Sequence, residues 1–91
     1  MTVVQHKIIH EPDKHIFYID LDNAEMAYLK YRILDNNQID FTSTLVPKTH
    51  RGQGIAAQLV AEGFAWADQE NLTIKASCWY AQKKLMEREE N

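Results

Sequence analysis

Two short segments hold the residues whose types and spacing could do chemistry. In the first, Arg51, Gly52, Gln53 and Gly54 stand directly before an apolar helical pattern that begins at Ile55. A helix start has unpaired N–H groups and a partial positive charge, glycine lets a ligand approach the backbone, and arginine can bind phosphate oxygens through two nitrogens. The segment therefore predicts a phosphate-binding loop, although a flexible turn and helix cap fit the same local pattern. It is neither a P-loop, because no Gly-Lys-Ser/Thr follows, nor a dinucleotide fingerprint, which needs a third glycine.

The second segment is Cys78-Trp79-Tyr80. A tyrosine hydroxyl can give a proton to a departing group, and a cysteine thiol can be a nucleophile, an acid or part of a pocket wall. Both residues also have structural interpretations, Tyr80 as an aromatic that closes the core and Cys78 as a small buried hydrophobe. Nucleophilic use needs a lowered pKa, which a helix starting after Cys78 would favour. No general base stands out among four candidate carboxylates, which are Glu11, Asp20, Asp40 and Glu62.

The elements that must position these residues begin with three predicted strands. Residues 16–21 are rich in β-forming residues, and apolar and polar residues alternate over 27–33 and 39–46. Asp22-Asn23 and Asp35-Asn36-Asn37 are turn signals between them. Strands joined by turns this short form an antiparallel meander.

The period then changes from that of a strand to that of a helix. Apolar residues recur at helical spacing over residues 55–67, a short strand follows over 73–77, and a last helix runs from residue 79 to about 88. A strand, a helix and a second strand in succession imply a crossover and a parallel pair. The predicted fold is α/β, a mixed sheet in which the meander is followed by a strand–helix–strand crossover and a C-terminal helix.

Length, charge and composition narrow the class of protein. Ninety-one residues predict one domain, residues 1–91. The net charge of -3 argues against nucleic-acid binding. No apolar run reaches the ~20 residues of a membrane span and the N-terminal apolar stretch is too short for a signal peptide, so we expect a cytoplasmic protein without a membrane partner. One cysteine allows no internal disulfide, and the four histidines lack zinc-ligand spacing, so no metal is predicted.

The segment from Arg51 to Ala56 resembles the Arg/Gln-x-x-Gly-x-Gly/Ala signature of the GCN5-related N-acetyltransferase (GNAT) family. Thr44-Leu45-Val46-Pro47 before the loop and Cys-x-Tyr after the next strand are similar to its short YjdJ-like branch. The resemblance implies a minimal GNAT fold that uses acetyl-coenzyme A. The loop amides would hold the pyrophosphate of the cofactor, and the backbone of Thr44, Leu45 and Val46 would pair with its pantetheine arm. The residues implied for cofactor binding are Thr44, Leu45, Val46, Arg51, Gly52, Gln53, Gly54, Ile55 and Ala56.

The function implied is acetyl transfer to an amine, with Cys78 and Tyr80 near the thioester and Tyr80 as the acid for the departing thiolate. Because no base for Cys78 is visible, direct attack by the amine is favoured over an acetylated cysteine. The chain departs from the family pattern in two ways: Ser43 stands where the branch commonly has a histidine, and no helices separate the first strands.

Two rival functions and several acceptors stay open. The rivals are a coenzyme A-binding interaction module with little catalysis and a general phosphate or nucleotide binder. The acceptor could be a small amine, a polyamine or a protein lysine. We expect a monomer or a weak homodimer.

Overall fold

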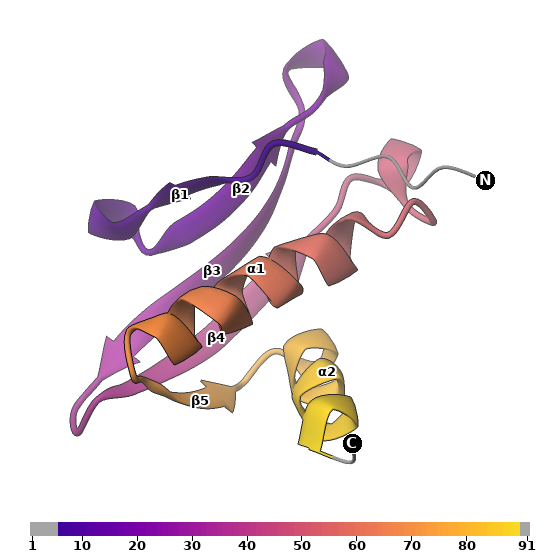
Figure 1. Cartoon of the computed structure of the whole chain (residues 1–91). Coiled ribbons are helices and arrows are strands. Elements are labelled where there is room, and N and C mark those ends of the chain that lie inside the picture. The colour runs from indigo at the N-terminus through magenta and orange to yellow at the C-terminus, as the bar shows by residue number, and fades with distance from the viewer. Residues whose placement is uncertain (1–5, 90–91) are drawn as a thin grey trace.

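The computed structural model describes residues 6–89, so most of the N-terminal stretch considered for a signal peptide lies outside it. A five-stranded sheet with the order β1-β2-β3-β4-β5 forms its centre (Figure 1). The first four strands pair antiparallel, whereas β4 and β5 are parallel, which confirms the predicted mixed sheet. The strands are β1 (Ile9–Glu11), β2 (Ile16–Asp20), β3 (Met26–Leu34), β4 (Gln38–Leu45) and β5 (Thr73–Ala76).

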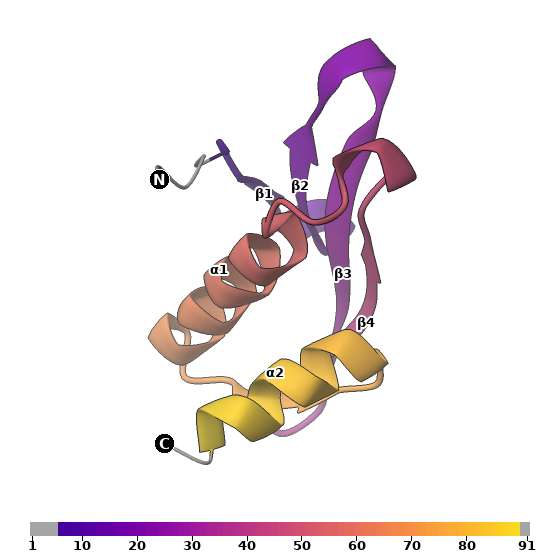
Figure 2. The ribbon, with the colours of Figure 1, turned by 90° about the vertical axis from the view of Figure 1, so that its right-hand side faces the viewer.

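Two helices, α1 (Ile55–Gln69) and α2 (Trp79–Glu89), cover the sheet. The helix α1 follows β4 and precedes β5 in the chain, and it lies across the sheet with more contacts to β3 than to any other strand. The helix α2 packs beside the parallel pair (Figures 1 and 2). The two helices meet near their C-terminal ends, where Arg88 Nη2 lies 2.7 Å from an Asp68 carboxylate oxygen and the guanidinium lies 5.5 Å from the centre of the Phe64 ring.

The core lies between α1 and the sheet face turned toward it. Alternate residues of β2, β3 and β4 point into it, and α1 supplies its apolar stripe, as the two periods predict. Of α2, Ala81 is fully buried. The core side chains of the strands and α1 are Phe17, Ile19, Ala27, Leu29, Tyr31, Ile39, Phe41, Ile55, Leu59, Val60, Phe64 and Ala67.

The strand β1 is the element that the sequence did not predict. Its three residues are too few to show a period, and tertiary contacts hold it in place. His10 stacks on its cross-strand neighbour Phe17 with ring centres 3.9 Å apart, and its Nε2 lies 2.7 Å from the Tyr31 hydroxyl. The Trp66 ring meets His10 edge-on at 4.6 Å. Burial among these rings lowers the pKa of His10, and the nearby Glu62 carboxylate offsets part of that effect.

The other boundaries differ from the prediction by a residue or two. β2 and β4 each end one residue earlier than expected, and the turn at Asp22-Asn23 is a short 3₁₀ helix, Asp22–Ala24. Two further 3₁₀ turns are Pro12–Lys14 and Lys48–His50. The second turn forms where predicted, and Asn36 and Asn37 in it have positive φ, as does Asn71 after α1.

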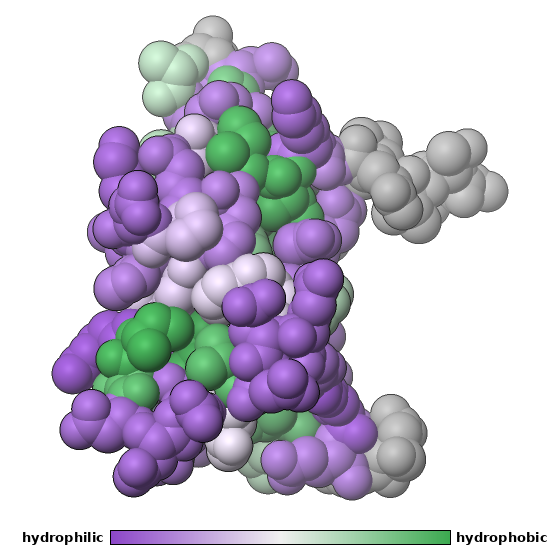
Figure 3. All heavy atoms as spheres, turned by 60° about the vertical axis from the view of Figure 1, so that its left-hand side comes forward, coloured by the Kyte–Doolittle hydropathy of each residue, from purple (hydrophilic) through white to green (hydrophobic). Residues whose placement is uncertain are grey.

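The surface is mostly hydrophilic, with separate hydrophobic groups on the face drawn in Figure 3. Large apolar side chains are exposed at several elements rather than along one stripe, among them Met26 on β3, Leu45 on β4, and Trp79 and Met86 on α2. Within residues 6–89, neither helix has the length and apolar character to cross a membrane.

Candidate acyl-coenzyme A site

The loop before α1, residues 51–54, has the backbone geometry of an anion cradle. Gly52 and Gly54 both take the left-handed conformation, with φ of 82° and 79°, which side chains disfavour. A Cβ on Gly54 would meet nothing within 4 Å, so the loop faces open space. The first main-chain hydrogen bond of α1 runs from the Gln58 N–H to the Gly54 carbonyl at 3.1 Å. The three N–H groups before Gln58 therefore belong to the open helix start, where an anion is favoured.

Arg51 ties this loop to the end of β4. Its Nε donates a hydrogen bond to the Val46 carbonyl at 3.1 Å, and the side chain remains exposed. Lys48 is also exposed, so the approach to the loop carries two positive charges. The backbone of Val46 was expected to pair with the pantetheine arm. Its carbonyl has two lone pairs, so one stays available beside Arg51.

The parallel strands separate just before this loop. Their last pair is Phe41 with Ala76, and β4 then runs on to Leu45 while β5 stops. A pocket of about 310 Å³ lies at this separation. Its walls come from the end of β4, the start of α1 and the start of α2, namely Thr44, Leu45, Val46, Arg51, Ala56, Cys78, Trp79 and Tyr80.

A second pocket, of about 220 Å³, adjoins the first and has Gly52 and Gly54 among its walls. The two pockets share Val46, Arg51, Ala56 and Tyr80 as walls. The helix start and the Cys78 thiol therefore border two adjoining pockets, and the walls of both pockets are mainly apolar.

Cys78 lies directly before α2, and its carbonyl accepts the Gln82 N–H at 2.9 Å. Its Sγ is 3.4 Å from the Thr44 hydroxyl across the strand separation. Burial alone would raise the pKa of Cys78. Hydrogen bonds with the Thr44 hydroxyl and with backbone groups, including those of Tyr80 and Ala81 at the start of α2, outweigh it, so the thiol pKa lies below its usual value.

Tyr80 lies in the first turn of α2, half-buried, and borders both pockets. Its ring meets Trp79 edge-on with centres 6.0 Å apart, and Lys84 Nζ lies 5.6 Å from the ring centre on α2. The hydroxyl end of an amphipathic ring in this position can serve a ligand in either pocket.

Ten of the eleven predicted site residues line these pockets, and Gln53 does not. The Ile55 side chain is only 1% exposed and belongs to the core, so a ligand would meet its backbone. The sequence prediction did not include His50, Ala57 and Trp79, which also line the pockets. Trp79 was identifiable from the sequence, because it stands between the two predicted catalytic residues. The structure shows it 72% exposed.

The carboxylates considered as bases lie elsewhere or are engaged. Both oxygens of Asp40 accept hydrogen bonds from Ser77. Glu11 is in β1 and Asp20 in β2, on the far side of the sheet order from β5. Among the described residues, no three His, Cys, Asp or Glu side chains converge as metal ligands.

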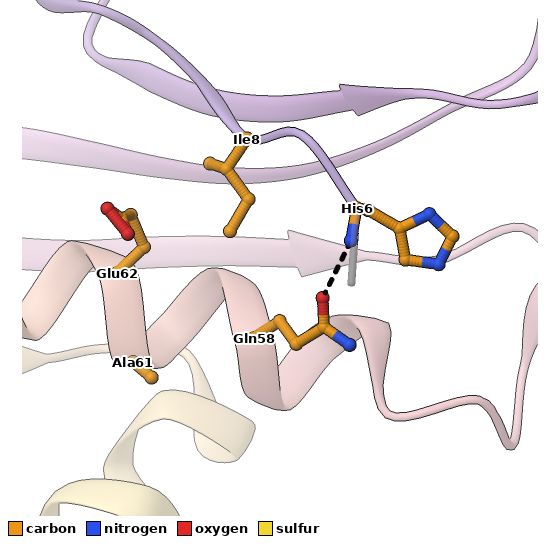
Figure 4. A pocket seen from close by; sticks show the side chains of 5 residues that line it. All are labelled: His6, Ile8, Gln58, Ala61 and Glu62. Carbon is orange, nitrogen blue, oxygen red and sulfur yellow. Dashed lines mark hydrogen bonds between the residues drawn. The ribbon is translucent and has the colours of Figure 1, made fainter. Parts of the chain in front are cut away.

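A separate hollow of about 370 Å³ lies on the other flank of α1, beneath the segment that leads into β1 (Figure 4). The His6 N–H lies 3.4 Å from Gln58 Oε1 there. The imidazole of His6 points away from the Glu62 carboxylate in Figure 4, so these groups do not converge on one reacting atom. None of the predicted site residues lines this hollow.

Comparisons with known proteins match most of the chain. Residues 16–91 match the family described as GCN5-related N-acetyl-transferase. Protein NATD1 of Mus musculus is 29% identical over 82 residues, covering 89% of this chain and 74% of that protein. Protein NATD1 of Homo sapiens is also 29% identical over 82 residues, covering 89% of this chain and 73% of that protein.

A solved structure agrees with the fold. The solution structure of a GCN5-like protein from Staphylococcus aureus has a TM-score of 0.73 and 33% identity, covering 92% of this chain and 81% of that one. These matches do not distinguish the YjdJ-like branch from the rest of the family. The match over residues 16–91, together with the mixed sheet and its strand separation, shows that the chain belongs to the GCN5-related N-acetyltransferase family.

Proposed function

We propose that this protein is an acetyl-coenzyme A-dependent N-acetyltransferase that acts on an amine. The observation that supports this most directly is the pair of adjoining pockets, which links the open start of α1 to the Cys78 thiol. A ligand with a pyrophosphate at one end and a thioester at the other has the chemistry to fill both ends. Family membership supports the same donor.

The residues present fit such a ligand. The N–H groups at the start of α1 and the Arg51 guanidinium would hold the pyrophosphate. The backbone of Thr44 to Val46 lies past the last β4–β5 pair, so its hydrogen-bonding groups on that side can pair with the amides of the pantetheine arm. Trp79 and Leu45 add apolar wall to the same pocket.

When bound, acetyl-coenzyme A supplies the activated acetyl group. The walls would place the thioester at the first turn of α2, where Tyr80 Oη holds the proton that the departing thiolate needs. The acceptor amine attacks directly and Cys78 stays unacetylated, because within residues 6–89 the thiol has no basic side chain as a hydrogen-bond partner. The competing route passes through an acetylated Cys78. It needs an experimental test, because the lowered pKa of Cys78 favours a thiolate, which would need no base.

One observation favours an alternative, a coenzyme A-binding module with little turnover. Only the short turn Asp22–Ala24 separates β2 from β3, so this loop supplies no helix to enclose an acceptor. A small amine, a polyamine and a protein lysine are all acceptors that an open site would admit. Openness matters most for the protein lysine, because an enclosed site would exclude the bulkiest acceptor first.

The test has two arms, binding and turnover. Acetyl-coenzyme A at ~100 times its dissociation constant should stabilise the fold by about 2.7 kcal/mol, which raises the melting temperature by roughly 10–20 °C in a domain of this size. ATP should compete poorly, because it lacks the pantetheine arm. No shift at millimolar acetyl-coenzyme A would refute the proposal, and equal competition by ATP would favour a general phosphate binder.

Turnover is measured as release of free coenzyme A thiol with a panel of small amines, polyamines and lysine peptides. Amine-dependent release identifies the acceptor class. Binding without release for any amine would favour the non-catalytic module.

A further inference from the structure

Asp40 is a buried carboxylate that the proposed reaction does not use. It lies on β4, only 9% exposed, with Arg32 and Lys75 as its cross-strand neighbours. Its Oδ1 accepts the Ser77 N–H at 2.8 Å and its Oδ2 accepts the Ser77 hydroxyl at 2.6 Å. Burying a carboxylate is costly unless it is hydrogen-bonded, so Ser77 compensates for the burial.

Ser77 is the residue at which the chain leaves the sheet. The Phe41 carbonyl accepts the N–H of Ser77 at 3.0 Å and that of Cys78 at 3.1 Å, immediately after the last β4–β5 pair. The chain then turns into α2. We call the Asp40 carboxylate with its two hydrogen bonds to Ser77 the Ser77 clasp.

The clasp lies one residue from the thiol at the site. Cys78 follows Ser77 directly, and its Sγ lies 3.4 Å from the Thr44 hydroxyl and beside the first N–H groups of α2. A rotation of the backbone at Ser77 would move the Cys78 thiol away from the Thr44 hydroxyl and from the start of α2, because Cys78 is the next residue in the chain.

We infer that Asp40 is a positioning residue: by holding Ser77 it fixes the corner between β5 and α2 and sets the Cys78 thiol against Thr44 and the start of α2. The inference rests on the proposed function for the reaction that this thiol borders. The clasp itself can be measured without acetyl-coenzyme A, so its failure and that of the proposed function are distinguishable.

Replacing Asp40 should change the pKa of the Cys78 thiol in opposite directions under the two explanations of why the carboxylate is there. If the carboxylate acted only through its charge, Asp40→Asn would remove a negative group near the thiol and lower the thiol pKa. If it positions the corner, Asp40→Asn weakens the clasp, loosens the hydrogen bonds that stabilise the thiolate, and raises the thiol pKa toward the ordinary value of about 8.5.

The experiment is the pH dependence of iodoacetamide alkylation, which reports one site because Cys78 is the single cysteine of the chain. We expect Asp40→Asn to shift the midpoint upward and to slow alkylation at neutral pH about threefold to tenfold, since only the thiolate reacts. Ser77→Ala removes the hydroxyl bond without changing charge and should shift the midpoint the same way, by less. Asp20→Asn, an exposed acid on β2, is the matched control and should behave as wild type.

Circular dichroism and a thermal melt establish that each variant is folded before its thiol is titrated. An unchanged or lowered midpoint in folded Asp40→Asn overturns the inference. If that variant does not fold, Ser77→Ala decides, and an unchanged midpoint there overturns it as well.

Discussion

The substitution Gly54→Ala tests whether the start of α1 receives the phosphates. Gly54 has a φ of 79°, where a side chain costs about 1–2 kcal/mol, and no atom lies within 4 Å of the added Cβ. The free protein should therefore lose about that much stability through backbone strain alone. The strain is present with and without ligand, so it cancels from the binding affinity as long as the loop keeps its shape.

A bound pyrophosphate would change that balance, because the new methyl group would stand where the ligand approaches the backbone. We expect coenzyme A to bind at least tenfold more weakly, about 1.4 kcal/mol. Arg51→Lys should lose less, since lysine keeps the charge and gives up only the two-nitrogen contact.

Gly63→Ala is the matched control, the same substitution nine positions later, inside α1 and on its core side. Its Cβ would lie 2.8 Å from both Leu29 Cδ2 and Phe41 Cε1. Overpacking of about 1–3 kcal/mol should exceed the roughly 1 kcal/mol that alanine gains over glycine in a helix. This variant should lose stability without losing affinity.

The assay is calorimetric titration with coenzyme A, at a temperature where melting curves show all three variants folded. Wild-type affinity in folded Gly54→Ala would refute the reasoning and place the phosphates elsewhere. Equal weakening by Gly63→Ala would show that general destabilisation, not the loop, controls the affinity.

Three further outcomes follow from the site and the core. Tyr80→Phe should slow acetyl transfer by ~10²–10⁴ while coenzyme A affinity stays within about threefold, and unchanged turnover would leave Tyr80 as core packing. Under direct attack, mass spectrometry of wild type mixed with acetyl-coenzyme A should show no acetyl group on Cys78 and Cys78→Ala should keep some activity; a kinetically competent acetyl-cysteine would overturn the direct route. Because burial lowers the folded pKa of His10, its contribution to stability is present above about pH 6.5 and is lost as pH falls through that lowered pKa. His10→Phe keeps a ring beside Phe17 and should flatten this acid loss in thermal melts, and an unchanged slope would contradict it.

The sequence alone was sufficient for the meander, the helix α1 and the position of the glycine loop. Apolar residues alternate along the strands and recur at helical spacing after Gly54. The structure has the elements that these patterns predict, because each element buries one face. The asparagine turns and the two left-handed glycines are also local, since they depend on the backbone preference of single residues.

Tertiary structure alone decided the contacts that join distant segments. Asp40 and Ser77 are 37 residues apart, and Cys78 and Thr44 are 34 apart, so no local pattern predicts that a carboxylate holds the corner or that a hydroxyl faces the thiol. Both contacts follow from the register of the parallel pair, Phe41 opposite Ala76, which hydrogen bonding across the sheet sets. The strand β1 shares this origin, because its ring contacts and hydrogen-bond partner exist only once the sheet and α1 have packed. For the lowered pKa of Cys78, the contact with Thr44 is tertiary, whereas the helix start after the thiol was already predicted from the sequence.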